Sequence, residues 1–201
     1  MTSIERISAV CDAVEYVIRN RIPGDVVECG VWRGGASMAA AKTCLRLGEV
    51  CRSLWLYDTF AGMSEPGACE DEQTHAKWRR LNQSDRNEWC CASLDDVKQN
   101  LMATGYPLDH MRFVVGKVED TLPGCMPSQI AVLRLDTDWH DSTAWELKHL
   151  YPLLSPGGVL IIDDYGHWAG SRKAVDDYFR THGLSPLLCR TDYTGRMCIK
   201  A

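Results

Sequence analysis

Short apolar runs that end in acidic residues constrain the fold of this chain more than any other feature. Two of these runs are followed by aspartates, Asp136 and Asp138 after the first and Asp163 and Asp164 after the second. Apolar runs of this length, without alternating polar residues, are typical of strands buried on both faces, as in a parallel sheet. The sequence therefore predicts an open α/β sheet with acidic side chains at the carboxyl ends of its strands, where such sheets bind ligands.

Helix and strand signals alternate along all 201 residues, which suits one α/β domain. We expect strands at 26–29, 54–58, 111–116, and in the runs ending at Asp136 and Asp163, followed by two strands joined through Asp192–Gly195. Helices are expected at about 37–47, 93–104, 142–150 and 171–181, and an N-terminal helix within residues 1–22 should begin with a capping box from Thr2 to Glu5. Residues 59–92 are polar and lack a clear strand, so we expect an active-site lid there.

The composition favours a soluble globular protein, with 45% hydrophobic and 24% charged residues. A net charge of -5 argues against a nucleic-acid partner, which needs concentrated Lys and Arg. The apolar runs are too short to span a bilayer, so no membrane partner is expected. The N-terminus lacks the pattern of a signal peptide, and we expect a cytoplasmic protein.

Ten cysteines are many for this length, and three explanations could account for them. A disulfide framework does not suit a chain without an export signal. A zinc site is disfavoured because no C-x-x-C pair occurs. Reduced cysteines used as small apolar residues, such as Cys29 and Cys198 in predicted strands, are the favoured explanation.

A glycine-rich turn follows the first predicted strand, at Gly30–Gly35. Trp32 occupies the position of the middle glycine in the dinucleotide fingerprint, where a bulky residue hinders approach of a pyrophosphate. A nucleoside without a pyrophosphate fits better, and S-adenosylmethionine is such a ligand. We expect its amino-acid end over this turn, which includes Trp32 and Gly34, and its ribose on Asp58. A turn needed only for tight strand–helix geometry is the alternative.

The four aspartates at the ends of the two apolar runs would repel one another unless a cation or protons intervened. Mg²⁺ suits an all-oxygen ligand set and keeps positions open for substrate. The alternative is that these aspartates are helix caps or solvated turn residues. His167, two residues beyond Tyr165, is expected either to face a substrate or to be a surface histidine. The tryptophans at 139, 145 and 168 are expected in core and rim packing.

Several segments together resemble the macrocin O-methyltransferase family. They are LDTDWHDST, ELKHLYPLLSPGGVLIIDDYGHW, SRKAVDDYF, VVECGVWRGG, LYDTFAGM, EWCCASLDDVKQN and VVGKVEDTLP, and they cover nearly the whole chain from about Gly24. The resemblance implies a Rossmann-like class I methyltransferase with seven strands, the last of them antiparallel. It further implies a magnesium- and S-adenosylmethionine-dependent enzyme that methylates a sugar hydroxyl of a glycosylated natural product such as an antibiotic, and a homodimer or higher homo-oligomer.

Carried over position by position, the resemblance implies magnesium ligands at Asp136, Asp163 and Asp164 and a general base at Asp138. It implies cofactor contacts at Glu28, Gly30, Ser37, Asp58 and Asp136, with Glu119 and Asp120 near the adenine. The chain departs from the family in its short N-terminal region and in reading Trp-His-Asp where the family often has Trp-Tyr-Glu. Both departures fall where the acceptor should bind, so the sequence does not predict the acceptor.

Three other functions are alternatives to a sugar O-methyltransferase. A catechol-type O-methyltransferase would use the same metal chemistry on an aromatic diol, but the predicted lid is mostly charged and polar. A catalytically silent S-adenosylmethionine-binding module would not need the full acidic set. A nicotinamide oxidoreductase is disfavoured by Trp32 and by the surplus of carboxylates.

Overall fold

The computed structural model describes residues 2–201. The helices are α1 (Ile4–Arg19), α2 (Gly35–Arg46), α3 (Glu72–Leu81), α4 (Leu94–Met102), α5 (Val118–Thr121), α6 (His140–Leu150) and α7 (Ala169–Thr181), with 3₁₀ turns at Leu108–His110 and Tyr151–Leu153. The strands are β1 (Asp25–Cys29), β2 (Leu54–Asp58), β3 (Met111–Val115), β4 (Ile130–Leu135), β5 (Leu154–Ile162), β6 (Cys189–Arg190) and β7 (Arg196–Ile199).

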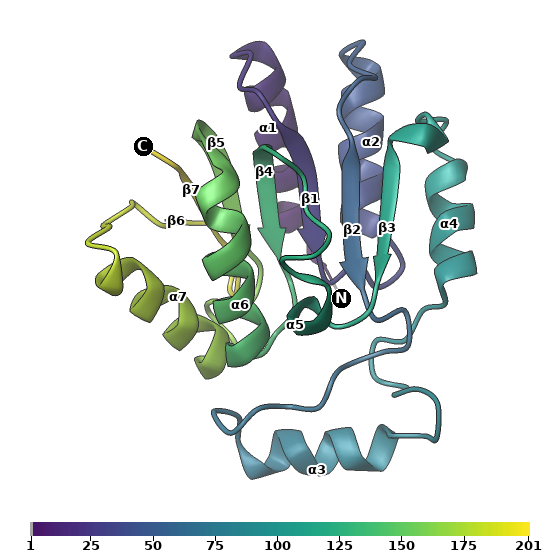
Figure 1. The fold of residues 1–201 in the computed structure, drawn as a ribbon, viewed down its shortest axis with the longest axis vertical. Coiled ribbons are helices and arrows are strands. Elements are labelled where there is room, and N and C mark those ends of the chain that lie inside the picture. Colours follow the sequence, from purple (N-terminus) through teal and green to yellow (C-terminus); the bar gives the residue numbers. More distant parts are fainter. Residues whose placement is uncertain (1) are drawn as a thin grey trace.

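The seven strands form one sheet in the order β3-β2-β1-β4-β5-β7-β6 (Figure 1). Strands β1 to β5 pair in parallel, whereas β7 runs antiparallel to both β5 and β6. The predicted mostly parallel sheet with an antiparallel C-terminal strand is therefore confirmed. Since the order reverses between β1 and β4, the carboxyl ends of these two strands flank the crevice in which such sheets bind ligands.

Helices cover both faces of the sheet, which explains why its central strands are apolar throughout. Helices α1, α2 and α4 pack on one face, and α5, α6 and α7 pack on the other (Figure 1). Successive residues of β1 point to opposite faces, so Val26 contacts the first layer and Val27 the second. Glu28 shares the face of Val26 and therefore points toward α1 and α2.

The N-cap of the first helix is one residue later than predicted. Ser3 is the N-cap, and its hydroxyl accepts a hydrogen bond from the backbone N–H of Arg6 at 3.2 Å. The predicted capping box from Thr2 to Glu5 is therefore wrong, because Ser3 offers the same hydroxyl nearer the first turn. The Ser3 hydroxyl also donates to Asp192 of the β6–β7 turn at 2.8 Å, which ties the start of the chain to its end.

The polar segment expected as a lid contains a helix that the sequence analysis missed. Helix α3 lies beyond the carboxyl ends of the central strands, apart from both helical layers (Figure 1). Only Thr74 of this helix is buried, so it has no apolar stripe that could reveal it. The segment is tied to the sheet edge, since the indole N–H of Trp139 donates to the Ser64 carbonyl at 3.0 Å.

All ten cysteines are free thiols. Cys29, Cys44 and Cys198 are buried, as expected of small apolar residues, but Cys51, Cys69, Cys90, Cys125 and Cys189 are exposed. Apolar packing therefore explains only part of the cysteine content. Within residues 2–201, no helix combines the length and the apolar character needed to cross a membrane.

Candidate active site

A cavity of about 450 Å³ opens at the carboxyl ends of the central strands. Its acidic lining residues come from three strand ends: Asp58 at the end of β2, Asp136 and Asp138 after β4, and Asp164 after β5. Gly30 and Trp32, which follow β1, line the same cavity. The strand-end aspartates and the glycine-rich turn predicted from the sequence thus meet in one place.

Close backbone approach fixes the glycine turn. Gly30 has a φ of 84°, and a Cβ there would lie 1.9 Å from the carbonyl oxygen of Asp136, so only glycine fits. The Asp58 carboxylate accepts hydrogen bonds from the backbone N–H groups of Val31 at 2.7 Å and Trp32 at 2.9 Å. Its Oδ2 atom accepts both of these bonds, whereas Oδ1 accepts from the Phe60 N–H at 2.8 Å. Asp58 therefore holds the turn in place, and only Oδ1 has room for a further donor.

A smaller cavity of about 70 Å³ adjoins the first and shares Gly30, Asp58 and Asp136 with it. Glu119, at the start of α5, lines this second cavity, whereas Asp120 lines neither of the two. Of the two residues predicted near the adenine, only Glu119 therefore lines a cavity.

Three predicted cofactor residues lie away from both cavities. Gly34 is the N-cap of α2, with a φ of 82°. Glu28 and Ser37 are buried beneath the turn, where the Ser37 hydroxyl donates to the Glu28 carboxylate. Burial raises the pKa of Glu28. These two side chains face the protein interior, and direct contact with a ligand in either cavity would need them to move.

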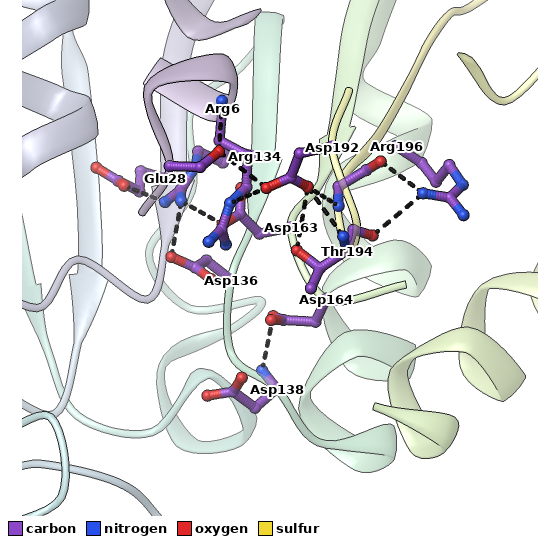
Figure 2. Close-up of polar contacts among 12 residues, drawn as sticks. Arg6, Glu28, Arg134, Asp136, Asp138, Asp163, Asp164, Asp192, Thr194 and Arg196 are labelled. Atoms are coloured by element: carbon purple, nitrogen blue, oxygen red, sulfur yellow. Dashed lines mark hydrogen bonds and ion pairs between the residues drawn. The ribbon is translucent and has the colours of Figure 1, made fainter. Parts of the chain in front are cut away.

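Arg134 lies at the centre of a buried ion-pair network, which we call the inner charged cluster and define as Arg6, Glu28, Arg134, Asp136 and Asp163 (Figure 2). Arg134 of β4 is in register with Glu28 of β1, and their side chains pair at 2.5 Å. Its other terminal nitrogen lies 2.8 Å from Asp136 and 2.9 Å from Asp163. Arg6 of α1 also pairs with Asp163, at 2.5 Å.

These arginines change the argument made from the sequence. Repulsion among the strand-end carboxylates was expected to need a metal ion or protons, but Arg6 and Arg134 already supply two positive charges. Among residues 2–201, no three His, Cys, Asp or Glu side chains gather closely enough to hold a metal ion. Carboxylate repulsion alone therefore does not require magnesium.

Asp138 and Asp164 form a second group, the outer carboxylate pair, and within residues 2–201 no ion pair joins either of them to an arginine or lysine. The Asp138 backbone N–H donates to the Asp164 carboxylate at 3.2 Å. Burial and the neighbouring Asp136 raise the pKa of Asp138 to about 7. Burial and the charge of Asp138 likewise raise the pKa of Asp164 well above its ordinary value.

Asp138 lies in a turn and not in a continuation of β4. Strand β4 ends at Leu135, and Asp138 is left-handed with a φ of 66°. Strand alternation therefore does not place Asp136 and Asp138 together, although both line the same cavity. The alternative role of Asp138 as a helix cap is wrong, because Trp139 is the N-cap of α6.

The carboxylates fit magnesium in the kind of donor they offer. The Oδ1 atom of Asp163 is buried and has no hydrogen-bond partner among the described residues, although Oδ2 pairs with both arginines. Burial also raises the pKa of Asp136. An unpartnered buried carboxylate oxygen is a donor suited to a hard divalent cation, although the side chains described in residues 2–201 would have to move closer together to hold one.

Aromatic rings line one side of the cavity. Trp139 is almost fully buried, and its ring lies 5.1 Å from that of Trp168 and 5.7 Å from that of Trp89. Trp89 and Trp168 line the cavity, as does His167. Core and rim packing is thus confirmed for Trp139 and Trp168. Trp145 also packs at the rim of the core, away from this cavity and beside His149, with 4.6 Å between ring centroids.

Sequence reasoning missed several residues of this site. Arg134 is a charged residue within an otherwise apolar strand that is buried on both faces. Such a residue indicates a buried partner of opposite charge, and this signal could have identified it. Lys77 lies over the Trp89 ring at 3.5 Å and lines the cavity, but α3 had no pattern that could place it. Arg6 and Tyr193 come from the two ends of the chain, and no local signal joins them to the site.

The comparisons with known proteins agree with this architecture. The family model described as "Macrocin-O-methyltransferase (TylF)" matches residues 1–199. An 8-demethyl-8-(2,3-dimethoxy-alpha-L-rhamnosyl)-tetracenomycin-C 4'-O-methyltransferase of Streptomyces olivaceus is 39% identical over 97% of this chain and 73% of its own length. The mycinamicin III 3''-O-methyltransferase of Micromonospora griseorubida is 36% identical, over 97% of this chain and 76% of its own length.

Among solved structures, the O-methyltransferase NovP is 34% identical, with a TM-score of 0.86 over 99% of this chain and 81% of that one. The calicheamicin methyltransferase CalS11, at 18% identity and a TM-score of 0.72 over 98% of this chain and 80% of that one, shares the fold. With a strand-end acidic site on a methyltransferase sheet and a family match across nearly the whole sequence, the chain belongs to the macrocin O-methyltransferase family and is an O-methyltransferase.

Proposed function

We propose that this enzyme transfers the methyl group of S-adenosylmethionine to a sugar hydroxyl of a glycosylated natural product, in a magnesium-dependent reaction of an antibiotic pathway. The observation that carries the proposal is the meeting of the glycine-rich turn with Asp136, Asp138 and Asp164 around one cavity. Relatives that cover 97% of the chain are named as methyltransferases of a rhamnosyl tetracenomycin and of mycinamicin III, which supports the acceptor class.

The cofactor is proposed to lie across the two adjoining cavities. Its amino-acid end would lie over the turn at Gly30 and Trp32, and its adenosine would extend into the smaller cavity that Glu119 lines. Asp58 lines both cavities, and its Oδ1 atom can accept from a ribose hydroxyl while Oδ2 holds the turn.

Magnesium is proposed to be held by Asp136, Asp163 and Asp164. The unpartnered Oδ1 of Asp163 is the donor that supports this most directly. When bound, the ion would make the acceptor hydroxyl more acidic, as Lewis acids do for coordinated oxygen. Arg134 and Arg6 would keep the inner carboxylates oriented from the protein side.

Asp138 is proposed to take the proton of the acceptor hydroxyl. It lines the cavity, and its pKa of about 7 lies near the pH at which a general base works best. His167, on the aromatic side of the cavity, is proposed to contact the acceptor. Alignment of the hydroxyl oxygen with the sulfonium methyl would supply much of the acceleration.

Transfer of a radiolabelled methyl group tests the proposal. The purified enzyme is incubated with labelled S-adenosylmethionine and a panel of glycosides, with Mg²⁺ or with excess EDTA, and a catechol is included as the rival acceptor. We expect label on a sugar oxygen only when Mg²⁺ is present. Full activity in EDTA would contradict the metal, and label on the catechol alone would favour the rival enzyme.

Calorimetry with S-adenosylhomocysteine and NADH tests the cofactor separately. We expect S-adenosylhomocysteine to bind and Asp58→Ala to weaken that binding markedly, because hydrogen bonds to a charged group contribute about 1.5–3 kcal/mol each. Binding of NADH with no response to S-adenosylhomocysteine would overturn the proposal. A cytoplasmic location and a homo-oligomeric state remain predictions.

A further inference from the structure

A row of aromatic rings runs from the buried core of the site to the surface. Buried Trp139 contacts Trp168, whose ring centroid lies 4.8 Å from that of His167. His167 is in turn edge-on to Tyr193, at 6.0 Å. Trp168, His167 and Tyr193 all line the cavity that holds the carboxylates. The cavity therefore has polar groups at its strand-end floor and a continuous aromatic strip that leads outward.

Tyr193 ends this strip, and its side chain is 64% exposed. A single exposed aromatic residue is ordinary on a protein surface. This one differs because its turn is held from both sides. The Asp192 carboxylate accepts from the backbone N–H groups of Thr194 at 2.9 Å and Gly195 at 2.6 Å, and it pairs with Arg6 at 3.0 Å.

The same turn is pinned to the segment that follows β5. The Gly166 N–H donates to the Thr194 carbonyl at 2.8 Å, and a Cβ on Gly166 would lie 2.3 Å from the Tyr193 carbonyl oxygen. Arg6 joins the turn to Asp163, because it pairs with both Asp163 and Asp192 (Figure 2). Tyr193 is therefore an exposed ring on a fixed support at the cavity mouth, which suits contact with a ligand.

An exposed ring on a fixed turn, at the outer end of a cavity with an acidic floor, matches a ligand that is polar at one end and apolar at the other. We propose that Tyr193, with His167 behind it, binds the apolar aglycone of the acceptor while the sugar reaches the carboxylates. This inference rests on the proposed function and deepens it. It makes Tyr193 a specificity-determining residue, and it implies that a glycosyl transfer reaction supplies the substrate before methylation.

Paired acceptors test this inference. The 4-nitrophenyl and methyl glycosides of L-rhamnose and of other hexoses carry the same sugar with and without an apolar ring. For a sugar that the wild-type enzyme methylates, we expect a lower KM for the 4-nitrophenyl glycoside than for the methyl glycoside. Tyr193→Ala should reduce that preference about tenfold or more, since burial of a large apolar group contributes on this scale. Tyr193→Phe should retain most of it.

Leu187→Ala is the matched control, because Leu187 is 80% exposed and lies outside the cavity. It should leave the preference unchanged, and thermal unfolding should show that Tyr193→Ala is folded. An equal KM for both members of a pair in the wild type, or an unchanged ratio in Tyr193→Ala, would overturn the inference while leaving the proposed function intact. Methyl transfer to no glycoside at all would overturn the proposed function, and this inference with it.

Discussion

The inner charged cluster and the outer carboxylate pair lie at the same sheet edge but differ in how their charges are balanced. In the inner cluster, Arg134 and Arg6 contact every carboxylate. In the outer pair, Asp138 and Asp164 share a backbone hydrogen bond, and no ion pair among the described residues joins either to an arginine or lysine. Burial raises pKa values in both groups, so the ion pairs are what distinguishes them. The difference suggests that the inner group holds the site together, whereas the outer group is poised to exchange protons and ligands.

The largest effect is expected from removing the central cation of the inner cluster. Arg134→Met would leave Glu28, Asp136 and Asp163 short of a partner, and loss of one partner in a buried ion pair typically costs about 3–5 kcal/mol. Urea unfolding would measure it. The control is Arg33→Met, whose exposed pair with Asp96 should contribute less than about 1 kcal/mol. Equal losses in the two variants would show that the inner charged cluster contributes no more to stability than an exposed ion pair.

Substitution of the neighbouring residues Asp163 and Asp164 should change the stability of the protein differently. Asp163→Asn removes the charge that Arg6 and Arg134 share, so the free energy of unfolding of the metal-free protein should fall by roughly 1.5–3 kcal/mol. Asp164→Asn removes an unbalanced charge and keeps an acceptor for the Asp138 N–H, so stability should be unchanged or slightly higher. A fall of the same size in both variants would show that the outer pair is also structural.

The free energy of unfolding is also expected to depend on pH through Asp138. In the folded protein the pKa of Asp138 is about 7, above the value of about 4 for an unfolded aspartate, so the folded state binds more protons between these values. Stability from this group is therefore present at low pH and is lost as pH rises through about 7. In EDTA, the stability of Asp138→Asn relative to the wild type should increase from pH 5 to pH 8. A difference that does not change with pH would contradict the raised pKa.

The sequence predicted the sheet well because each strand carries its own apolar signal. Runs such as Ile130–Leu135 are buried along their whole length. Three of the four aspartates that follow such runs line one cavity, whereas Asp163 is fully buried and does not line it. Helix α3 escaped prediction because its stability comes from its cap and surface contacts, with only Thr74 buried. Local patterns describe elements that bury an apolar face, and this helix buries almost none.

The site was predicted less completely, because its partners are far apart in the sequence. Nothing near Asp163 shows that Arg6 will reach it, and the pairing of Glu28 with Arg134 depends on the register of β1 and β4. The position of Asp138 does not follow from the strand pattern, since β4 ends at Leu135 and Asp138 has a left-handed conformation. Charge balance and turn geometry are properties of the folded chain.

The most direct test of the account separates proton removal by Asp138 from metal binding. For Asp138→Asn, kcat for methyl transfer should fall by about 10²–10⁴, the usual range for loss of a general base. Calorimetry on the same preparation should give Mg²⁺ and S-adenosylhomocysteine affinities within about threefold of the wild type, because the proposed ligands Asp136, Asp163 and Asp164 are intact. A variant that loses Mg²⁺ affinity together with its rate, or that keeps the wild-type rate, would contradict the role assigned to the outer carboxylate pair.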